Sequence, residues 1–257
     1  MSATLVSPNV ATLNAERPRP KRVANTHKNL AIVGYGKMGR LIEQLAPEYG
    51  FAVQLRLDSA NNRAASAITA ANFRGIDVAV DFSHAAAAAQ NIERLAVLGI
   101  NAVVGTTGWT EHLERAKSAV QDGGVGLVWS PNYSIGVSLF LQLAAEASRR
   151  IARYHEYGAW AWEIHHSAKK DAPSGTLLKV VSEMKSADPL REISVSSNRA
   201  GAHPGTHEVG FDSAADTITI RHTARSREGF ARGALTAAQW VIGKHGWFEF
   251  RDVLIEH

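Results

Sequence analysis

Residues 29–129 alternate between short runs rich in β-branched residues and longer stretches with the spacing of amphipathic helices. This pattern predicts strands at 30–33, 51–58, 77–82, 102–104 and 125–129, and helices at 38–45, 84–98 and 110–120. Strands that alternate with helices are typical of parallel sheets, in which each helix returns the chain to the same end of the sheet. The sequence therefore predicts an α/β fold of the Rossmann type, with a doubly wound parallel sheet.

The pattern changes after Pro131. A long apolar helix is predicted at 135–153, followed by strands at 160–164, 193–196, 207–211 and 217–220 with fewer helices between them. These elements predict a second, α+β domain on a mixed or antiparallel sheet. A last helix, predicted at 230–242, can pack back on the first sheet. We thus expect one domain of residues 29–132 plus about 232–257, and a second of residues 133–231.

The net positive charge of the chain comes entirely from its N-terminal segment. The 257 residues carry a formal net charge of +4. Residues 1–28 account for all of it, with five cations and one anion. The segment has no apolar periodicity and predicts a flexible basic tail, with an organelle-import signal as the minor alternative. The neutral remainder argues against a nucleic-acid partner.

Two simple features bear on the compartment. No apolar run approaches the roughly 20 residues that a membrane span needs, so no membrane partner is expected. The chain has no cysteine, which excludes disulfides and thiol catalysis. We expect a cytoplasmic protein.

A glycine-rich loop lies between the first predicted strand and the first predicted helix. Its GxGxxG pattern places glycines where a tight turn, a close approach to a pyrophosphate and close packing of helix on strand require them. The next strand ends at Asp58, whose carboxylate suits the ribose hydroxyls of NADH and repels the 2′-phosphate of NADPH. We predict that NADH is favoured, although Arg56 and Arg63 could also accommodate NADPH. The predicted cofactor contacts here are Gly34, Tyr35, Gly36, Lys37, Met38, Gly39 and Asp58.

Two further loops follow predicted strands of the same sheet. Ligands of open α/β sheets bind outside the carboxyl ends of the strands, and glycines and small hydroxyl residues permit close approach of the backbone. An ordinary connecting loop would have the same composition, so both readings stay open. The predicted contacts are Gly105, Thr106 and Thr107 in one loop and Ser130, Pro131, Asn132 and Tyr133 in the other.

Residues 163–176 (EIHHSAKKDAPSGT) concentrate titratable groups before a predicted helix. His165 suits acid/base chemistry and Lys169 suits a carboxylate, so the segment fits a small dicarboxylate substrate that also needs a proton. Ser174 is the predicted N-cap, and the N–H groups of Gly175 and Thr176 would face a second carboxylate. The alternative is a solvated charged loop before a capped helix.

No metal site is expected. His165 and His166 are adjacent, so on a strand they point to opposite faces. His203 and His207 have helical spacing, but Pro204 and Gly205 interrupt any helix between them.

Together these residues resemble the 4-hydroxy-tetrahydrodipicolinate reductase family, also called dihydrodipicolinate reductase. The resemblance covers essentially residues 29–254. It is carried by GYGKMGR at 34–40, GTTGW at 105–109, SPNYSIGV at 130–137 and EIHHSAKKDAPSGT at 163–176. The chain departs from the common family pattern in a glycine loop one residue shorter, and in Ser167 and Ala168 where more basic residues are usual.

The resemblance implies NAD(P)H-dependent reduction of a cyclic imine dicarboxylate, with loss of water, in lysine and diaminopimelate biosynthesis. It implies that His165 is the acid/base residue, that Lys169 is the proton donor, and that His166 grips the substrate carboxylates with Gly175 and Thr176. It also implies a homotetramer whose second domains pair their sheets, with substrate bound between the two domains. Two alternatives remain: another NAD-dependent dehydrogenase of small amino or imino acids, and a non-catalytic NAD-binding protein.

Overall fold

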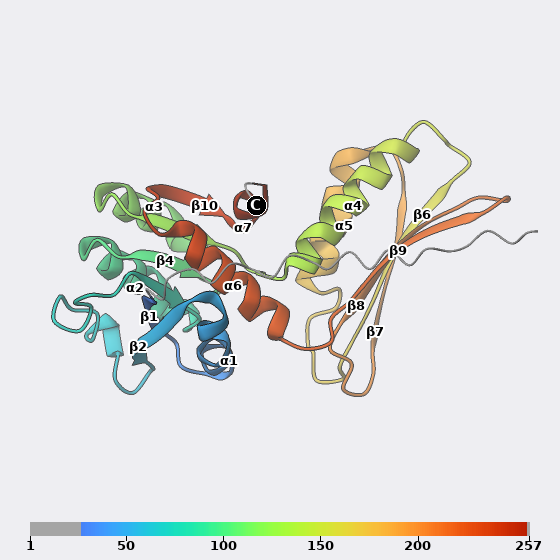
Figure 1. The fold of residues 1–257 in the computed structure, drawn as a ribbon. Helices are drawn as coiled ribbons and strands as arrows, with labels where there is room; N and C mark the ends of the chain where they lie inside the picture. The colour runs from blue at the N-terminus through green and yellow to red at the C-terminus, as the bar shows by residue number, and fades with distance from the viewer. Residues whose placement is uncertain (1–26, 256–257) are drawn as a thin grey trace, which may run out of the picture.

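The computed structural model describes residues 27–255, which form two lobes, each built on its own sheet (Figure 1). The predicted tail at 1–28 therefore lies almost wholly outside the described residues. Its last residue, Lys28, already belongs to the first strand.

The first sheet has six parallel strands in the order β10-β5-β4-β3-β1-β2. The order reverses at β1, which pairs with β2 on one side and β3 on the other, and ligands of doubly wound sheets bind at such a switch point. The predicted Rossmann-type sheet is confirmed. Its strands are β1 (Lys28–Val33), β2 (Phe51–Leu57), β3 (Val78–Asp81), β4 (Asn101–Val104), β5 (Gly126–Trp129) and β10 (Gly246–Glu249).

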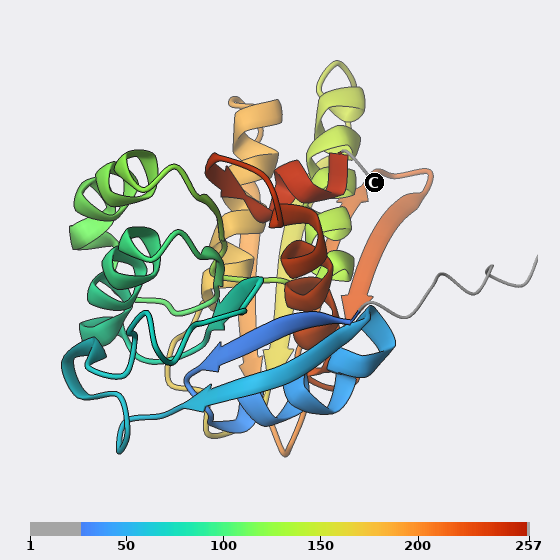
Figure 2. The same cartoon turned by 60° about the vertical axis from the view of Figure 1, so that its left-hand side comes forward.

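Helices cover both faces of this sheet (Figure 2). Leu30 and Ile32 of β1 pack with α1 (Lys37–Leu45) and α6 (Glu228–Val241). Ala31 and Val33 point the other way and pack with α2 (Ala85–Val97) and α3 (Leu113–Asp122). Alternate residues of a strand face opposite sides, so a strand buried on both faces is apolar throughout.

The C-terminal segment completes the first lobe. Helix α6 crosses the sheet and buries Ala231, Ala234 and Leu235 against it. The helix predicted at 230–242 therefore packs back on the first sheet, as expected. It begins at Glu228, ahead of the domain boundary expected near 232. Strand β10 and α7 (Phe250–Ile255) follow, and neither was predicted. The four residues of β10 do not alternate between apolar and polar, so they give no strand pattern.

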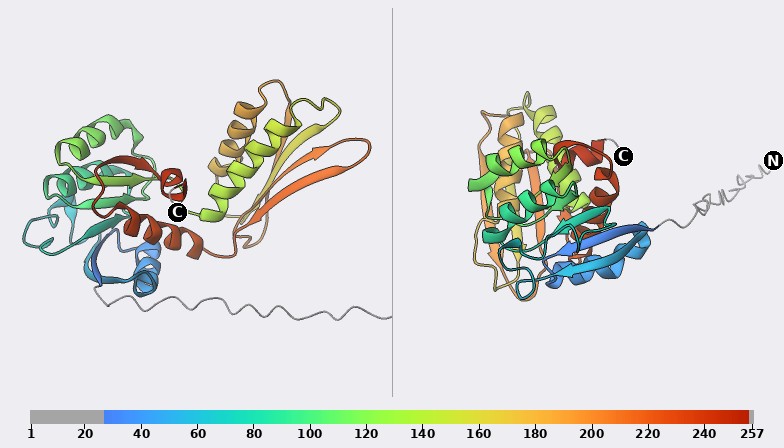
Figure 3. Two further views of the ribbon diagram at one scale, coloured as in Figure 1. Left: turned by 45° about the horizontal axis from the view of Figure 1, so that its top comes forward. Right: turned by 90° about the vertical axis from the view of Figure 1, so that its left-hand side faces the viewer.

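The second sheet has four strands in the order β7-β6-β8-β9. Strand β6 pairs parallel with β7 and antiparallel with β8, and β8 pairs antiparallel with β9, so the predicted mixed sheet is confirmed. Two helices cover one of its faces (Figure 3). The elements are α4 (Ile135–Ile151), β6 (Gly158–His165), α5 (Gly175–Ala187), β7 (Ile193–Arg199), β8 (Thr206–Asp212) and β9 (Thr217–Thr223).

The opposite face of the second sheet is not covered by a helix. Trp160 and Trp162 of β6 lie on it, out of phase with the buried residues Ala159 and Ala161. The Arg221 guanidinium on β9 lies over the Trp162 ring, 5.8 Å from its centroid. This face, the tryptophan face, also carries the ion pair of Arg221 with Glu208, which β8 places opposite Trp162.

Three short 3-10 helices complete the described chain: Ala46–Tyr49, Arg63–Ala65 and Thr110–His112. The last of these precedes α3, so the helix predicted at 110–120 begins as a tighter turn. Within residues 27–255, every helix is too short or too polar to cross a membrane.

Candidate active site

Two cavities lie beside the loops singled out in the sequence. The larger, about 1050 Å³, is a cleft between the lobes, and the smaller, about 380 Å³, lies at the carboxyl ends of β1, β2 and β3. The cleft brings Thr107, Ser130, Pro131 and Asn132 of the first lobe together with His165, Lys169, Ser174, Gly175 and Thr176 of the second.

The glycine loop forms one wall of the smaller cavity. Gly34 has φ of +95°, and a Cβ atom there would lie 2.4 Å from the carbonyl carbon of Phe82, so only glycine fits. Its N–H and that of Tyr35 donate to the Leu57 carbonyl, at 2.8 and 3.0 Å. Gly34, Tyr35 and Gly36 line the cavity. The predicted contacts Lys37, Met38 and Gly39 lie in the first turn of α1 and do not line it.

Asp58 lines the smaller cavity on the opposite side. Its Oδ1 accepts from the N–H groups of Ala60 at 2.8 Å and Asn61 at 3.1 Å, so the carboxylate is held by its own turn. Arg56 does not approach it, because its Nε donates to Glu43 Oε1 at 2.7 Å. The carboxylate of Asp58 therefore lies at this end of the cavity.

A buried carboxylate ties the loop after β4 to the loop after β3. Asp81 accepts from the Ser83 hydroxyl at 2.7 Å, the Asn91 amide at 2.9 Å and the Thr106 hydroxyl at 2.8 Å. Thr106 is thus a structural partner of Asp81 and its hydroxyl points away from the cleft, whereas Thr107 lines it. At Gly105 a Cβ atom would lie 2.2 Å from the Phe82 ring, so this loop needs a glycine.

The loop after β5 has two parts. Ser130, Pro131 and Asn132 line the cleft. Tyr133, a predicted cofactor contact, is instead buried, and its hydroxyl lies 3.1 and 2.8 Å from the carbonyl oxygens of Val104 and Val128. Its ring packs on Phe250 at 4.9 Å between centroids, so this side chain anchors the loop and does not reach the cleft.

The segment after β6 carries the charged side of the cleft. Lys169 Nζ lies 2.8 and 2.9 Å from the two Asp171 carboxylate oxygens, and both residues line the cleft. Ser174 caps α5 by accepting from the Leu177 N–H at 3.2 Å, as predicted from its position. Gly175 and Thr176 are the first two residues of α5, and both line the cleft. His166, the predicted carboxylate-binding residue, does not line the cleft.

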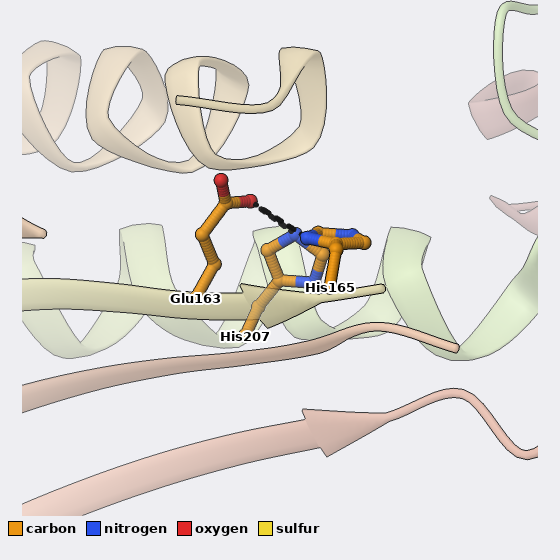
Figure 4. A group of neighbouring side chains, drawn as sticks. All are labelled: Glu163, His165 and His207. Carbon is orange, nitrogen blue, oxygen red and sulfur yellow. Dashed lines mark ion pairs between the residues drawn. The ribbon is translucent and has the colours of Figure 1, made fainter. Parts of the chain in front are cut away.

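Glu163 lies at the centre of a buried polar network that sequence reasoning missed (Figure 4). Its Oε1 accepts from the Ser174 N–H at 2.8 Å and from Arg199 at 2.9 Å, and its Oε2 accepts from the Ser174 hydroxyl. His165 Nδ1 and His207 Nε2 each lie 3.3 Å from the same Oε2. The sequence pattern could have indicated this network. Glu163 lies in phase with the buried residues of β6, and a buried charged side chain almost always has a partner.

Burial and hydrogen bonding set the protonation of this network. Burial alone would raise the pKa of Glu163, but hydrogen bonds from Ser174 and Arg199 outweigh it and lower the pKa to about 2. Burial lowers the pKa of His207 to about 4, and it lowers the pKa of His165 against the opposing effect of Glu163. At neutral pH the carboxylate is ionised and both imidazoles are neutral.

Glu163, His165 and His207 also have ligand atoms within 4.8 Å of one another, a spacing that could hold a metal ion. A bound cation would compete with Arg199, which already donates to this carboxylate, and with the Ser174 hydroxyl. The arrangement favours a hydrogen-bond network over a metal centre.

Comparison with known proteins decides the family. A family model described as dihydrodipicolinate reductase, N-terminus, matches residues 28–133, and its C-terminal counterpart matches residues 136–254. The chain belongs to the dihydrodipicolinate reductase family. Members of this family are NAD(P)H-dependent oxidoreductases, which agrees with the glycine loop and with the predicted fold.

Two curated relatives carry the name 4-hydroxy-tetrahydrodipicolinate reductase. The protein of Christiangramia forsetii is 33% identical over 237 residues, covering 88% of this chain and 97% of the relative. That of Methanosarcina barkeri is 39% identical over 194 residues, covering 69% of this chain and 73% of the relative.

Solved structures show the same fold. A dihydrodipicolinate reductase from Paenisporosarcina sp. TG-14, solved with dipicolinate bound, has a TM-score of 0.70 and 20% identity, covering 87% of this chain and 97% of its own. A myo-inositol dehydrogenase from Corynebacterium glutamicum has a TM-score of 0.54 and 15% identity, covering 89% and 93%. The fold is therefore shared with this myo-inositol dehydrogenase, whereas the two family models match this chain to dihydrodipicolinate reductase.

Proposed function

We propose that the chain reduces 4-hydroxy-tetrahydrodipicolinate to tetrahydrodipicolinate in lysine and diaminopimelate biosynthesis. The reaction consumes one hydride from NAD(P)H and one proton, and the 4-hydroxyl leaves as water. The observation that carries the proposal is the single cleft in which loops of the nucleotide-binding sheet face His165, Lys169 and the start of α5.

The smaller cavity and the cleft together fit an extended dinucleotide. Gly36 lines the smaller cavity with no atom within 4 Å of its Cβ position, and Asp58 offers a carboxylate oxygen to ribose hydroxyls. The loops at Thr107 and at Ser130 to Asn132 would then hold the nicotinamide end, where the cofactor supplies the hydride. NADH is the preferred cofactor in this proposal, because Asp58 repels a 2′-phosphate and Arg56 is engaged by Glu43.

The charged side of the cleft fits a dicarboxylate. The first N–H groups of a helix and its dipole favour an anion, so Gly175 and Thr176 would hold one substrate carboxylate. The Lys169 ammonium lines the same cleft, and donation from Lys169 would supply the proton that accompanies the hydride, with the neutral imidazole of His165 as a proton acceptor beside it. His166 would have to turn toward the cleft to contact substrate.

We also propose the domain division that these roles imply. Residues 29–132 and about 232–257 would bind the dinucleotide, and residues 133–231 would bind substrate and assemble the homotetramer. The tryptophan face, exposed on the side away from α4 and α5, supports pairing of second-domain sheets between subunits.

A coupled assay tests the proposed reaction. Purified protein is mixed with freshly generated 4-hydroxy-tetrahydrodipicolinate, and the oxidation of NADH and of NADPH is followed separately. We expect turnover with both cofactors and a kcat/KM for NADH at least equal to that for NADPH. Absence of turnover at micromolar enzyme would reject the proposed reaction, and a strong NADPH preference would reject the role given to Asp58. L-Aspartate and meso-diaminopimelate with NAD⁺ serve as controls for an amino-acid dehydrogenase.

A further inference from the structure

Glu163 has no part in the chemistry described above, yet it is fully buried next to His165. An ionised carboxylate only accepts hydrogen bonds, and its two oxygens offer about four lone-pair positions. Three of these are taken by the Ser174 N–H, the Arg199 guanidinium and the Ser174 hydroxyl. Both imidazoles approach the same oxygen, since His165 Nδ1 and His207 Nε2 each lie 3.3 Å from Oε2.

The Ser174 hydroxyl and the Glu163 carboxylate together fix the tautomer of His207. The only proton of the hydroxyl goes to Glu163, so its oxygen must accept from its other neighbours, the Leu177 N–H at 3.2 Å and His207 Nε2 at 3.3 Å. His207 therefore carries its proton on Nε2, which lies 3.3 Å from two acceptors, Ser174 Oγ and Glu163 Oε2. His165 Nδ1 lies at the same distance, 3.3 Å, from the same Glu163 oxygen.

The two ring nitrogens of His165 are in different surroundings. Nδ1 is enclosed, and apart from Glu163 Oε2 at 3.3 Å it has no partner among residues 27–255. Nε2 is not among the enclosed atoms. It is close enough to Gly205 that a Cβ atom there would lie 2.9 Å from it. A proton on Nδ1 thus meets a carboxylate, and a lone pair on Nδ1 would face that same negative charge.

We infer that Glu163 is a positioning residue, which holds His165 with its proton on Nδ1 and leaves the Nε2 lone pair for the substrate cleft. This inference rests on the proposed function of His165 and deepens it. Glu163 also holds the Ser174 N–H at the start of α5. The Glu163 carboxylate thus fixes the tautomer of the acid/base residue His165. It also fixes the position of the start of α5, which is proposed to bind a substrate carboxylate.

The wild-type protein gives the first test. The ¹⁵N chemical shifts of the His165 ring at neutral pH distinguish the two neutral tautomers, and we expect protonated Nδ1 and unprotonated Nε2. The same spectrum should show His207 protonated on Nε2. A His165 ring protonated on Nε2 would overturn the inference, whether or not the protein reduces 4-hydroxy-tetrahydrodipicolinate.

The variant Glu163→Gln gives the second test. Its amide oxygen can still accept from Ser174 and Arg199, but its NH₂ group then faces His165 Nδ1, which must accept, so the proton moves to Nε2. We expect the ¹⁵N shifts of His165 to exchange their pattern and kcat to fall at least about 100-fold, as in other dyads whose tautomer is reversed. The KM for NADH should stay within about twofold of wild type, because Glu163 lies outside the nucleotide loops.

The pKa of His165 supplies an independent readout. The groups that act on it are Glu163 on β6, Arg199 on β7, His207 on β8, and His166 and Lys169 in the loop after β6. Of these only Glu163 is negative, so its replacement should lower the pKa of His165 further, measured by NMR titration. Glu192→Gln is the matched control, because Glu192 is an exposed carboxylate of the same lobe.

The outcomes separate the two proposals. If Glu163→Gln lowers only the melting temperature and leaves the tautomer and kcat as in wild type, Glu163 is merely structural and the inference fails. If the wild type is inactive but its His165 carries the proton on Nδ1, the proposed reaction fails while the positioning role stands. If Glu163→Gln does not fold, the wild-type spectrum decides.

Discussion

The Lys169 ammonium group lies in the cleft but is neutralised by its neighbour Asp171. A substrate carboxylate must therefore compete with Asp171 for it. We predict that Lys169→Ala lowers kcat by about 10²- to 10⁴-fold, the usual range for removal of a proton donor. Steady-state kinetics with saturating NADH measures the effect.

Lys170 is the matched control for this prediction. It is adjacent and cationic, but it is exposed and does not line the cleft. Lys170→Ala should keep kcat within about twofold of wild type. Equal losses in both variants would mean that the net charge of the loop matters and the position of Lys169 does not.

His207 makes stability depend on pH. Its pKa is about 4 in the folded protein against an ordinary 6.5, so between these values the unfolded chain binds a proton that the folded chain does not. The free energy of unfolding should therefore fall as pH drops from 6.5 to 4, by at most about 3 kcal/mol from this residue. Glu163, with a pKa near 2 against 4.5, adds a further loss between pH 4.5 and 2.

Urea denaturation across this pH range checks the prediction. His207→Gln retains a donor near Ser174 but cannot titrate, so its stability should decline less between pH 6.5 and 4. The lowered pKa values of His165 and His222 leave part of the slope in place. An unchanged slope would mean that His207 has the same pKa in the folded and unfolded states.

Helix α6 packs so closely on the loop after β5 that one of its positions admits only glycine. A Cβ atom at Gly233 would lie 1.8 Å from the Tyr133 carbonyl oxygen and 2.9 Å from the Phe250 ring. We predict that Gly233→Ala destabilises the protein by about 2–4 kcal/mol through this clash. Chemical denaturation measures it.

The same helix supplies the control. A Cβ atom at Gly229 would lie 3.7 Å from the nearest atom, an ordinary contact. Gly229→Ala should leave stability unchanged or raise it by roughly 0.5–1 kcal/mol, because alanine is the better helix former. A comparable loss in both variants would contradict the packing argument.

Most elements could be predicted because their periodicity is local. The apolar stripe of α4 and the alternation in β6 are visible in consecutive residues, and glycine at 34 marks the turn after β1. Strand β10 was not predicted, because the residues from Gly246 to Glu249 do not alternate between apolar and polar. Its place in the sheet comes only from pairing with β5.

The site could be predicted only in part, because its network joins residues distant in the chain. Register places Glu163 opposite His207 on β8 and next to Ser197 on β7, and neither pairing is visible in the sequence. From the sequence alone, His207 is therefore considered with His203, as a metal-binding pair that Pro204 and Gly205 argue against. Tyr133 and Thr106 have side chains suited to a ligand, and only the packing shows that they bond to the protein itself.

At the scale of the whole molecule, the tryptophan face is the surface proposed for self-association. Trp162 lies at its centre under Arg221, and the helices α4 and α5 cover only the opposite side. We predict that Trp162→Glu converts a tetramer into smaller species, because it removes a large aromatic ring and places a second carboxylate beside Glu208 in the proposed interface. Sedimentation velocity measures the assembly.

Leu190 gives the control for assembly, since it is 92% exposed in a turn away from this face. Leu190→Glu should leave the sedimentation coefficient unchanged. A monomeric wild type would contradict the prediction, and so would a Trp162→Glu variant that sediments as wild type does.

The return of α6 to the first sheet has a consequence for synthesis of the chain. Leu30 and Ile32 are among the first described residues to be made, but the helix residues that cover them, such as Leu235, are made last. While the ribosome translates the intervening lobe, the α6 side of the nascent sheet is exposed to water. A chain released before residue 228 would keep that apolar surface uncovered, so premature termination yields an aggregation-prone fragment and not a smaller soluble nucleotide-binding protein.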